Sequence, residues 1–170
     1  MISSGVREAG AALAGAIACA QRENATVATV LDGAVSSLDN AYRQAWSFCR
    51  PSSGASIVRR LDIAIETGIQ FSNDFEKCIC EMNDRVGLGE LASESIPAAF
   101  GFFTAAGGDV MKTVCLSINA GNNCDTVAML GAAVAGAFRG ADSIPGNHLE
   151  FLSEVNHMDI AGLARTITNL

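Results

Sequence analysis

The chain has 170 residues, and its 18 acidic against 11 basic side chains give it a formal net charge of −7 at pH 7. This charge disfavours a nucleic-acid partner, because phosphates would be repelled and the basic residues form no patch larger than the pair Arg59-Arg60. A membrane-spanning helix needs about 20 apolar residues, whereas the longest run of small apolar residues covers only positions 9–20. We therefore expect no nucleic-acid partner and no membrane span.

The predicted fold class is all-α, because apolar residues recur at helical spacing and no useful stretch alternates with the two-residue period of a strand. Gly, Pro and Asn breakers bound the expected helices. These are expected at residues 5–22, 26–37, 41–49, 56–70, 73–83, 93–106, 110–119, 125–138, 148–156 and 159–168, with Pro97 near the start of its helix.

The breaker regions are short, and aromatic residues make up only 6% of the chain against 17 glycines. Short connections and small residues favour one domain over residues 1–170, in which helix backbones approach closely. We expect a compact orthogonal bundle of about eight to ten helices.

The six cysteines stand in or beside apolar helical stretches, with no paired CxxC spacing and no nearby histidine. Reduced thiols in a cytoplasmic protein are the interpretation that this pattern favours. The pair Cys78 and Cys80 is too close for an ordinary disulfide and is a weak metal signal. The other cysteines are Cys19, Cys49, Cys115 and Cys124.

Residues 119–128 carry the most informative pattern, because glycine and paired amides give way abruptly to an apolar helix. Asn123, Asp125 and Thr126 offer an amide oxygen, a carboxylate and a hydroxyl, which suit Mg²⁺, Ca²⁺ or Mn²⁺ rather than zinc. The positive end of the helix dipole opposes a cation, so a metal site would need further acidic residues from elsewhere. The structural alternative is that Asn123 or a neighbour caps the helix while Asp125 interacts with the dipole.

The run GNNCDTVAMLGAAVAGAFRGADSIP, at residues 121–145, resembles the C-terminal signature of the ADP-ribosylglycohydrolase family. In that family a G-x-D-x-D-[ST] turn precedes a Gly/Ala-rich helix and a G-A-x-x-I-P exit. The segment ESIPAAFGFF, at residues 94–103, and Asn119 are also similar to the family, and a weaker match extends over most of the chain.

The resemblance implies an all-α fold with two Mg²⁺ or Mn²⁺ ions and an ADP-ribosylated substrate or ADP-ribose-like small molecule, whose bond at the anomeric carbon is hydrolysed. By position, Asp125 and Thr126 match metal ligands. Asn123 stands where the family usually has the first aspartate, so a neutral ligand replaces a charged one. Gly121 and Asn122 would lie beside the substrate. The loop at residues 87–91 matches a pocket-lining segment, with an exposed loop position as the alternative for Glu90.

Two family motifs are absent from this sequence, a G-D-A-x-G motif and a T-D-D-T run, which supply the remaining metal ligands in the N-terminal part of the usually much longer family members. We therefore expect an ADP-ribosylglycohydrolase-like hydrolase that needs an N-terminal half or a partner polypeptide carrying that half. The chain alone would be a fragment, a processed product or one subunit. The alternative function is a non-catalytic nucleotide-binding or structural homologue that has lost the dinuclear centre.

Overall fold

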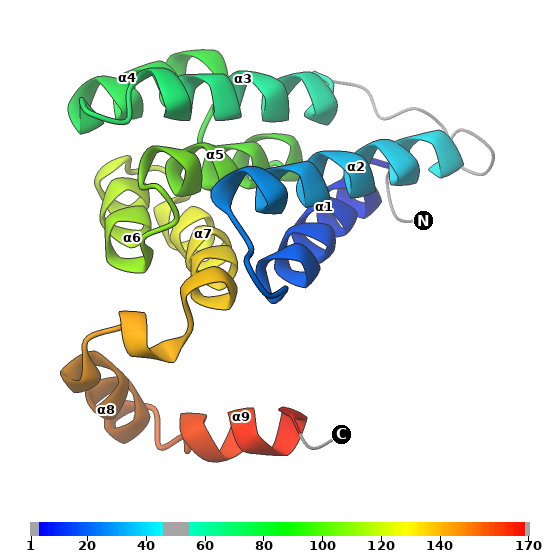
Figure 1. The fold of residues 1–170 in the computed structure, drawn as a ribbon. Helices are drawn as coiled ribbons and strands as arrows, with labels where there is room; N and C mark the ends of the chain where they lie inside the picture. The colour runs from blue at the N-terminus through cyan, green and yellow to red at the C-terminus, as the bar shows by residue number, and fades with distance from the viewer. Residues whose placement is uncertain (1–3, 46–54, 169–170) are drawn as a thin grey trace.

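The computed structural model describes residues 4–45 and 55–168, and its regular structure over these ranges is helical throughout (Figure 1). The prediction of an all-α protein is confirmed. In chain order the elements are α1 (Ser4–Ala20), α2 (Val27–Ala45), α3 (Ile57–Gln70), α4 (Phe75–Arg85), α5 (Ala92–Ala105), α6 (Val110–Asn119), α7 (Cys124–Arg139), the short 3₁₀ helix η1 (Ala141–Ser143), α8 (Gly146–Val155) and α9 (Ile160–Thr168). None of the helices described is long and apolar enough to cross a membrane.

Helix α5 lies at the centre of the bundle, because every residue from Ser95 to Ala105 is buried. It contacts α1, α3, α4, α6 and α7. Figure 1 shows α3 and α4 along one side of α5, with α6 and α7 on the other and the α1–α2 pair beside it. A helix that is apolar all round requires such enclosure. Helices α8 and α9 lie at the far end from α3 and contain no buried residue.

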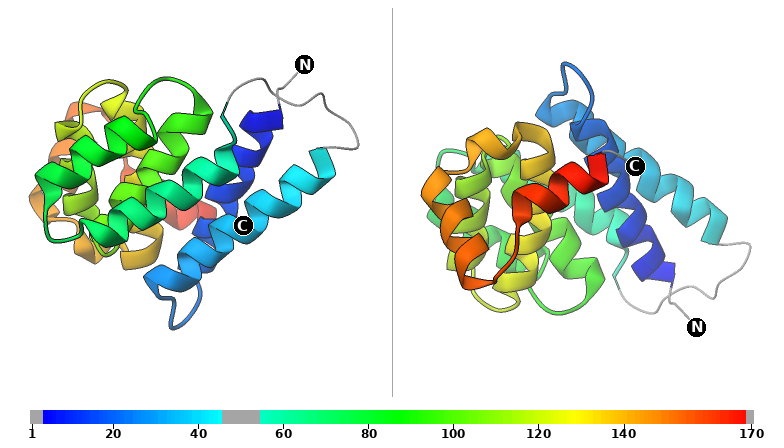
Figure 2. Two further views of the ribbon diagram at one scale, coloured as in Figure 1. Left: turned by 90° about the horizontal axis from the view of Figure 1, so that it is seen from above. Right: turned by 90° about the horizontal axis from the view of Figure 1, so that it is seen from below.

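Glycines allow the paired helices to approach closely, as the composition predicts. A Cβ added to Gly15 in α1 would lie 2.5 Å from the Gly33 carbonyl oxygen in α2, and one added to Gly33 would lie 2.8 Å from the Gly15 carbonyl oxygen. Figure 2 shows these two helices running side by side. The α3–α5 pair has the same design, since a Cβ on Gly101 would lie 2.9 Å from the Ala64 carbonyl oxygen. Backbone contact at these points leaves no room for a side chain.

The expected break between residues 37 and 41 is wrong, because α2 continues through it to Ala45. Leu38 is 1% exposed and belongs to the apolar core. Asp39 accepts from Arg43 one turn later at 2.6 Å, and Asn40 accepts from Gln44 at 3.2 Å. Polar residues that find partners four positions away support a helix instead of ending it. The remainder of the helix expected at 41–49 lies outside the described residues.

Cys78 and Cys80 differ in environment although they stand on the same helix, α4. Cys78 is fully buried, whereas Cys80 is exposed. Burial raises the pKa of the Cys78 thiol to about 11, and the nearby Asp74 carboxylate adds to this effect. The two thiols therefore do not form the metal-binding pair that their spacing weakly suggested. Cys49 lies outside the described residues.

We predict that Gly68→Ala destabilises the protein by about 1–3 kcal/mol, because the new Cβ would press against the Gly101 carbonyl oxygen and the backbone of α5. The matched control is Gly136→Ala in α7, where a Cβ meets nothing within 4 Å. This change should instead stabilise the helix by roughly 0.5–1 kcal/mol. Urea unfolding measures both values, and equal effects of the two substitutions would contradict the close α3–α5 contact.

A second prediction concerns thiol reactivity at pH 8, where Cys78 should resist iodoacetamide while Cys80 and Cys115 react. Peptide mass spectrometry measures each site, and unfolding in urea should abolish the difference. Because folding raises the Cys78 pKa from 9.0, stability should fall as the pH rises from 9 toward about 11. Rapid labelling of Cys78 in the folded protein would contradict its burial.

Candidate functional site

The candidate site is built on the turn at residues 120–123, which joins α6 to α7. Two successive residues of this turn have left-handed backbone conformations, Gly121 with φ of 71° and Asn122 with φ of 57°. Glycine and asparagine tolerate this region better than other residues do. A Cβ added to Gly121 would meet nothing within 4 Å, so the backbone of the turn is open to an approaching molecule.

Asn123 occupies the N-cap position of α7, but its side chain makes no capping hydrogen bond. The alternative in which this side chain caps the helix is therefore wrong. Asn123 instead bonds to the loop at residues 86–91, which joins α4 to α5. Its backbone N–H donates to the Leu88 carbonyl oxygen at 3.1 Å, and its Nδ2 donates to the Gly89 carbonyl oxygen at 3.4 Å. Since Nδ2 faces an acceptor, Oδ1 is the amide atom left to receive a donor or a cation.

Asp125 and Thr126 follow in the first turn of α7, where Asp125 is exposed and Thr126 is half-buried. Together with Asn123 they place three oxygen donors within four consecutive residues. The donor types fit a hard cation such as Mg²⁺. Their number does not complete a site, since Asp125 is the one carboxylate among them, and within residues 4–45 and 55–168 no three His, Cys, Asp or Glu side chains group together to hold a metal. A bound cation would need further oxygen ligands from water, substrate or another part of the protein.

Glu94, in the first turn of α5, binds the backbone of the loop that accepts the hydrogen bonds of Asn123. Glu94 Oε2 accepts the Gly89 N–H at 2.9 Å. A Cβ on Gly89 would lie 2.5 Å from this oxygen, and one on Gly87, whose φ is 88°, would lie 2.9 Å from Glu94 Cδ. Gly87 needs glycine for its positive φ, and a side chain at Gly89 would displace the Glu94 carboxylate, which lies directly against the loop backbone.

Arg60 of α3 holds Glu94 in turn. Its Nη1 lies 3.3 Å from Glu94 Oε1, 3.3 Å from the Ser93 carbonyl oxygen and 3.2 Å from Ser93 Oγ. Only about a fifth of each charged side chain is exposed, 22% for Arg60 and 19% for Glu94. The pair is thus shielded from solvent and salt more than a surface ion pair is.

Pro97 explains why the Ser93 carbonyl is available to Arg60. Helix α5 begins at Ala92, so Pro97 lies near its start, as the sequence led us to expect, but beyond its first turn. Without an N–H, Pro97 cannot donate to the carbonyl four residues earlier, which is that of Ser93. Arg60 supplies the missing donor from another helix.

The structure thus places the predicted residues Gly121, Asn122, Asn123, Asp125 and Thr126 on one turn and the helix start that follows it, with the 87–91 loop beside them. Glu90 of that loop is exposed. Sequence reasoning did not identify Arg60 or Glu94 as part of this arrangement. The signal available in the sequence was Pro97, which removes a backbone donor at a helix position where another group must replace it.

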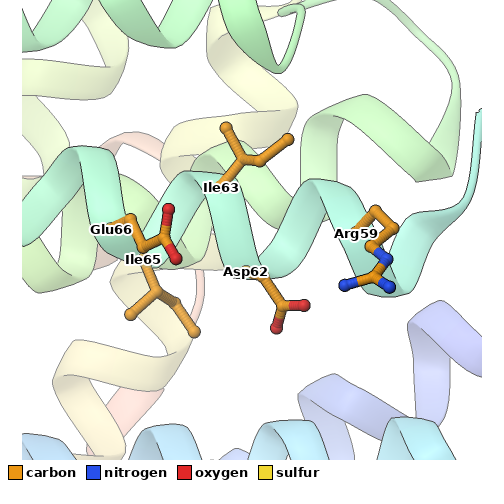
Figure 3. A pocket seen from close by; sticks show the side chains of 5 residues that line it. All are labelled: Arg59, Asp62, Ile63, Ile65 and Glu66. Atoms are coloured by element: carbon orange, nitrogen blue, oxygen red, sulfur yellow. The ribbon is translucent and has the colours of Figure 1, made fainter.

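A separate depression of about 380 Å³ lies along α3 and does not contain any predicted site residue. Among the residues that the structure describes, its lining side chains come from this one helix (Figure 3), and they are Arg59, Asp62, Ile63, Ile65 and Glu66. A surface formed by a single helix offers few converging groups, whereas ligand sites are usually enclosed by several elements. The α6–α7 turn is therefore the stronger candidate.

Comparison with known proteins agrees with the motif at residues 121–145. The chain matches the ADP-ribosylglycohydrolase family model over residues 4–170. It is similar to the uncharacterized protein YegU of Escherichia coli (strain K12), with 27% identity over 164 residues that cover 94% of this chain and 48% of YegU. The chain thus spans about half the length of this curated relative. No solved structure matches the chain. Because the family model matches nearly every residue, this chain belongs to the ADP-ribosylglycohydrolase family.

Proposed function

We propose that the α6–α7 turn forms part of a site that binds an ADP-ribosyl group and hydrolyses the bond at its anomeric carbon with the help of a divalent cation. The observation that carries this proposal is the arrangement of Asn123, Asp125 and Thr126 at the start of α7, on a turn held by the 86–91 loop. Family membership supports the reaction class.

The residues of the turn and of the start of α7 would have different roles according to their chemistry. Asp125 and Thr126 would hold a cation with a carboxylate and a hydroxyl oxygen, and Asn123 would add Oδ1 as a neutral donor. Mg²⁺ or Mn²⁺, when bound, would polarise ribose oxygens and activate water. The open backbone at Gly121 and Asn122 would lie against the substrate. In the net reaction the water oxygen bonds to the anomeric carbon, the bond to the acceptor breaks, and the acceptor gains a proton.

The proposed site requires ligands beyond this turn. The chain spans about half of its curated relative, and the acidic motifs expected in the N-terminal part of the family are absent from its sequence. The positive end of α7 also disfavours a cation unless more negative charge is present. We propose that the remaining acidic ligands come from the N-terminal half of the family fold, carried by a partner polypeptide or by more of the same protein.

A second candidate function is nucleotide binding without catalysis. It is favoured by the neutral side chain of Asn123, whose Nδ2 is already engaged by the Gly89 carbonyl. A site with one carboxylate could bind ADP-ribose through hydrogen bonds and backbone groups without activating water.

Hydrolysis assays with ADP-ribosyl-arginine and ADP-ribosyl-serine, with and without Mg²⁺ or Mn²⁺, separate these functions. The chain should bind ADP-ribose in calorimetry, and metal-dependent hydrolysis should require an added polypeptide that carries the acidic motifs. Hydrolysis by the chain alone would contradict the proposal that the site needs ligands from another polypeptide. Binding of ADP-ribose without hydrolysis in any combination would support the non-catalytic alternative.

We predict that Asp125→Asn lowers Mn²⁺ affinity by about tenfold or more, because it removes the one carboxylate among the three oxygen donors. Its effect on folding should stay within about 1 kcal/mol, the range for a charge near a helix N-terminus. The control is Glu150→Gln, an exposed carboxylate on α8, which should leave Mn²⁺ affinity unchanged. Electron paramagnetic resonance of free Mn²⁺ measures the affinity, and equal values for the two variants would count against Asp125 as a ligand.

Asn123→Asp should have two opposing effects. The added charge should raise Mn²⁺ affinity, while stability without metal should fall by about 1 kcal/mol, because a carboxylate cannot donate to the Gly89 carbonyl. Asn122→Asp is the matched control, since Asn122 is exposed and makes no such contact. Denaturant unfolding with and without Mn²⁺ measures both effects. An Asn123→Asp variant as stable as the native chain would show that the Nδ2 contact has no energetic role.

A further inference from the structure

We propose that Arg60 and Glu94 are positioning residues of the candidate site, which set the orientation of Asn123 through the loop at residues 86–91. The consequence for ligand binding rests on the proposed function. The positioning itself rests on a continuous series of hydrogen bonds from α3 to the start of α7.

The series begins at the start of α5. Pro97 cannot supply the N–H that residue 97 of a helix donates to the Ser93 carbonyl, and Arg60 Nη1 donates to this carbonyl at 3.3 Å while also contacting Ser93 Oγ. The guanidinium is therefore fixed by groups that do not depend on Glu94. Its charge then holds Glu94 Oε1 at 3.3 Å, with both side chains largely shielded from solvent.

The second step passes from Glu94 into the loop. Glu94 uses its other oxygen, Oε2, to accept the Gly89 N–H at 2.9 Å. A charged acceptor makes this bond stronger than one between neutral groups. The loop also has an apolar anchor, because Val86 is 1% exposed and Leu88 is 2% exposed. The carboxylate and the buried side chains together fix the path of the backbone between them.

The third step passes from the loop to the site. The carbonyls of Leu88 and Gly89 face the turn and receive the two donors of Asn123, its backbone N–H and Nδ2. Leu88 and Gly89 are adjacent, so a shift of the backbone at Gly89 moves the carbonyl oxygens of both residues at once. Glu94 therefore determines whether Asn123 keeps Oδ1 turned from the loop and available to a ligand.

Glu94 is not itself expected to touch the ligand. Its carboxylate is engaged by Arg60 on one oxygen and by the loop on the other. Removing such a supporting residue commonly lowers metal affinity by about 10- to 100-fold although no ligand is lost. A role confined to general stability would instead affect all parts of the fold together.

The test compares amide exchange and ligand binding in four variants of the full chain. Glu94→Ala removes both contacts, and Glu94→Gln retains one acceptor oxygen. Gly89→Ala keeps the Glu94 residue but displaces its carboxylate, because the new Cβ would lie 2.5 Å from Oε2. The control Asp39→Ala removes an ion pair with Arg43 on α2, away from the site.

We expect Glu94→Ala and Gly89→Ala to speed exchange of the amides of residues 89 and 123 by about fivefold or more, the effect of losing one hydrogen bond. The Phe103 amide in the centre of α5 serves as the reference for global opening. Mn²⁺ affinity should fall about tenfold, with an intermediate loss in Glu94→Gln and none in Asp39→Ala. Nuclear magnetic resonance and Mn²⁺ titration provide the two readouts.

The positioning role is overturned if the Asn123 amide in Glu94→Ala exchanges as in the native chain, or changes only in step with Phe103. It is also overturned if Glu94→Ala binds Mn²⁺ as tightly as the native chain does. A native chain that binds neither Mn²⁺ nor ADP-ribose, even together with a polypeptide that carries the acidic motifs, contradicts the proposed function instead. The exchange rates then still decide whether Glu94 positions Asn123.

Discussion

The position of the candidate site depends on one missing backbone donor, the N–H that Pro97 lacks. A carbonyl left without a partner away from water costs about 1–3 kcal/mol, so the Ser93 carbonyl needs a donor from outside its helix. Arg60 supplies it and thereby ties α3 to the first turn of α5. The same guanidinium aligns Glu94 with the 86–91 loop. The missing N–H in α5 thus leads to contacts among α3, α5 and the 86–91 loop. The α6–α7 turn is hydrogen-bonded to this loop.

The close packing of the central helices makes this arrangement rigid. Arg60 can reach α5 at fixed geometry because Gly68 and Gly101 bring the backbones of α3 and α5 into contact farther along the same helices. Helix α5 is enclosed on every side and cannot shift without disturbing its neighbours. The 86–91 loop, which precedes α5, is fixed to the core by the buried side chains of Val86 and Leu88. The turn at Asn123 therefore lies on the core and is not a free surface loop.

Sequence patterns predicted the features that depend on near neighbours. Helical periodicity located most helices, and the glycine and amide run located the turn before α7. The same local reasoning failed where a distant group competes with a local one. Asn123 has the residue type of a helix cap, yet its side chain bonds to Gly89, which lies 34 positions away. The role of Arg60 was equally invisible, because its partners lie 33 and 34 residues further along the chain. The candidate site residues were predicted from the local pattern and from the resemblance, whereas the contacts of Arg60 and Glu94 required the tertiary structure.

The neutral side chain of Asn123 suits the position that the structure gives it. An amide carries both a donor and an acceptor, so it can bond to the Gly89 carbonyl with Nδ2 and present Oδ1 to a ligand. An aspartate carries only acceptors when ionised and would face the carbonyl oxygen with like charge. Asparagine therefore attracts a cation less strongly than aspartate would, but its hydrogen bond to Gly89 orders the turn before a ligand binds. With Asp125 as the one carboxylate among the three oxygen donors, a cation here would depend on negative groups brought by the substrate, such as phosphates, or by another part of the protein.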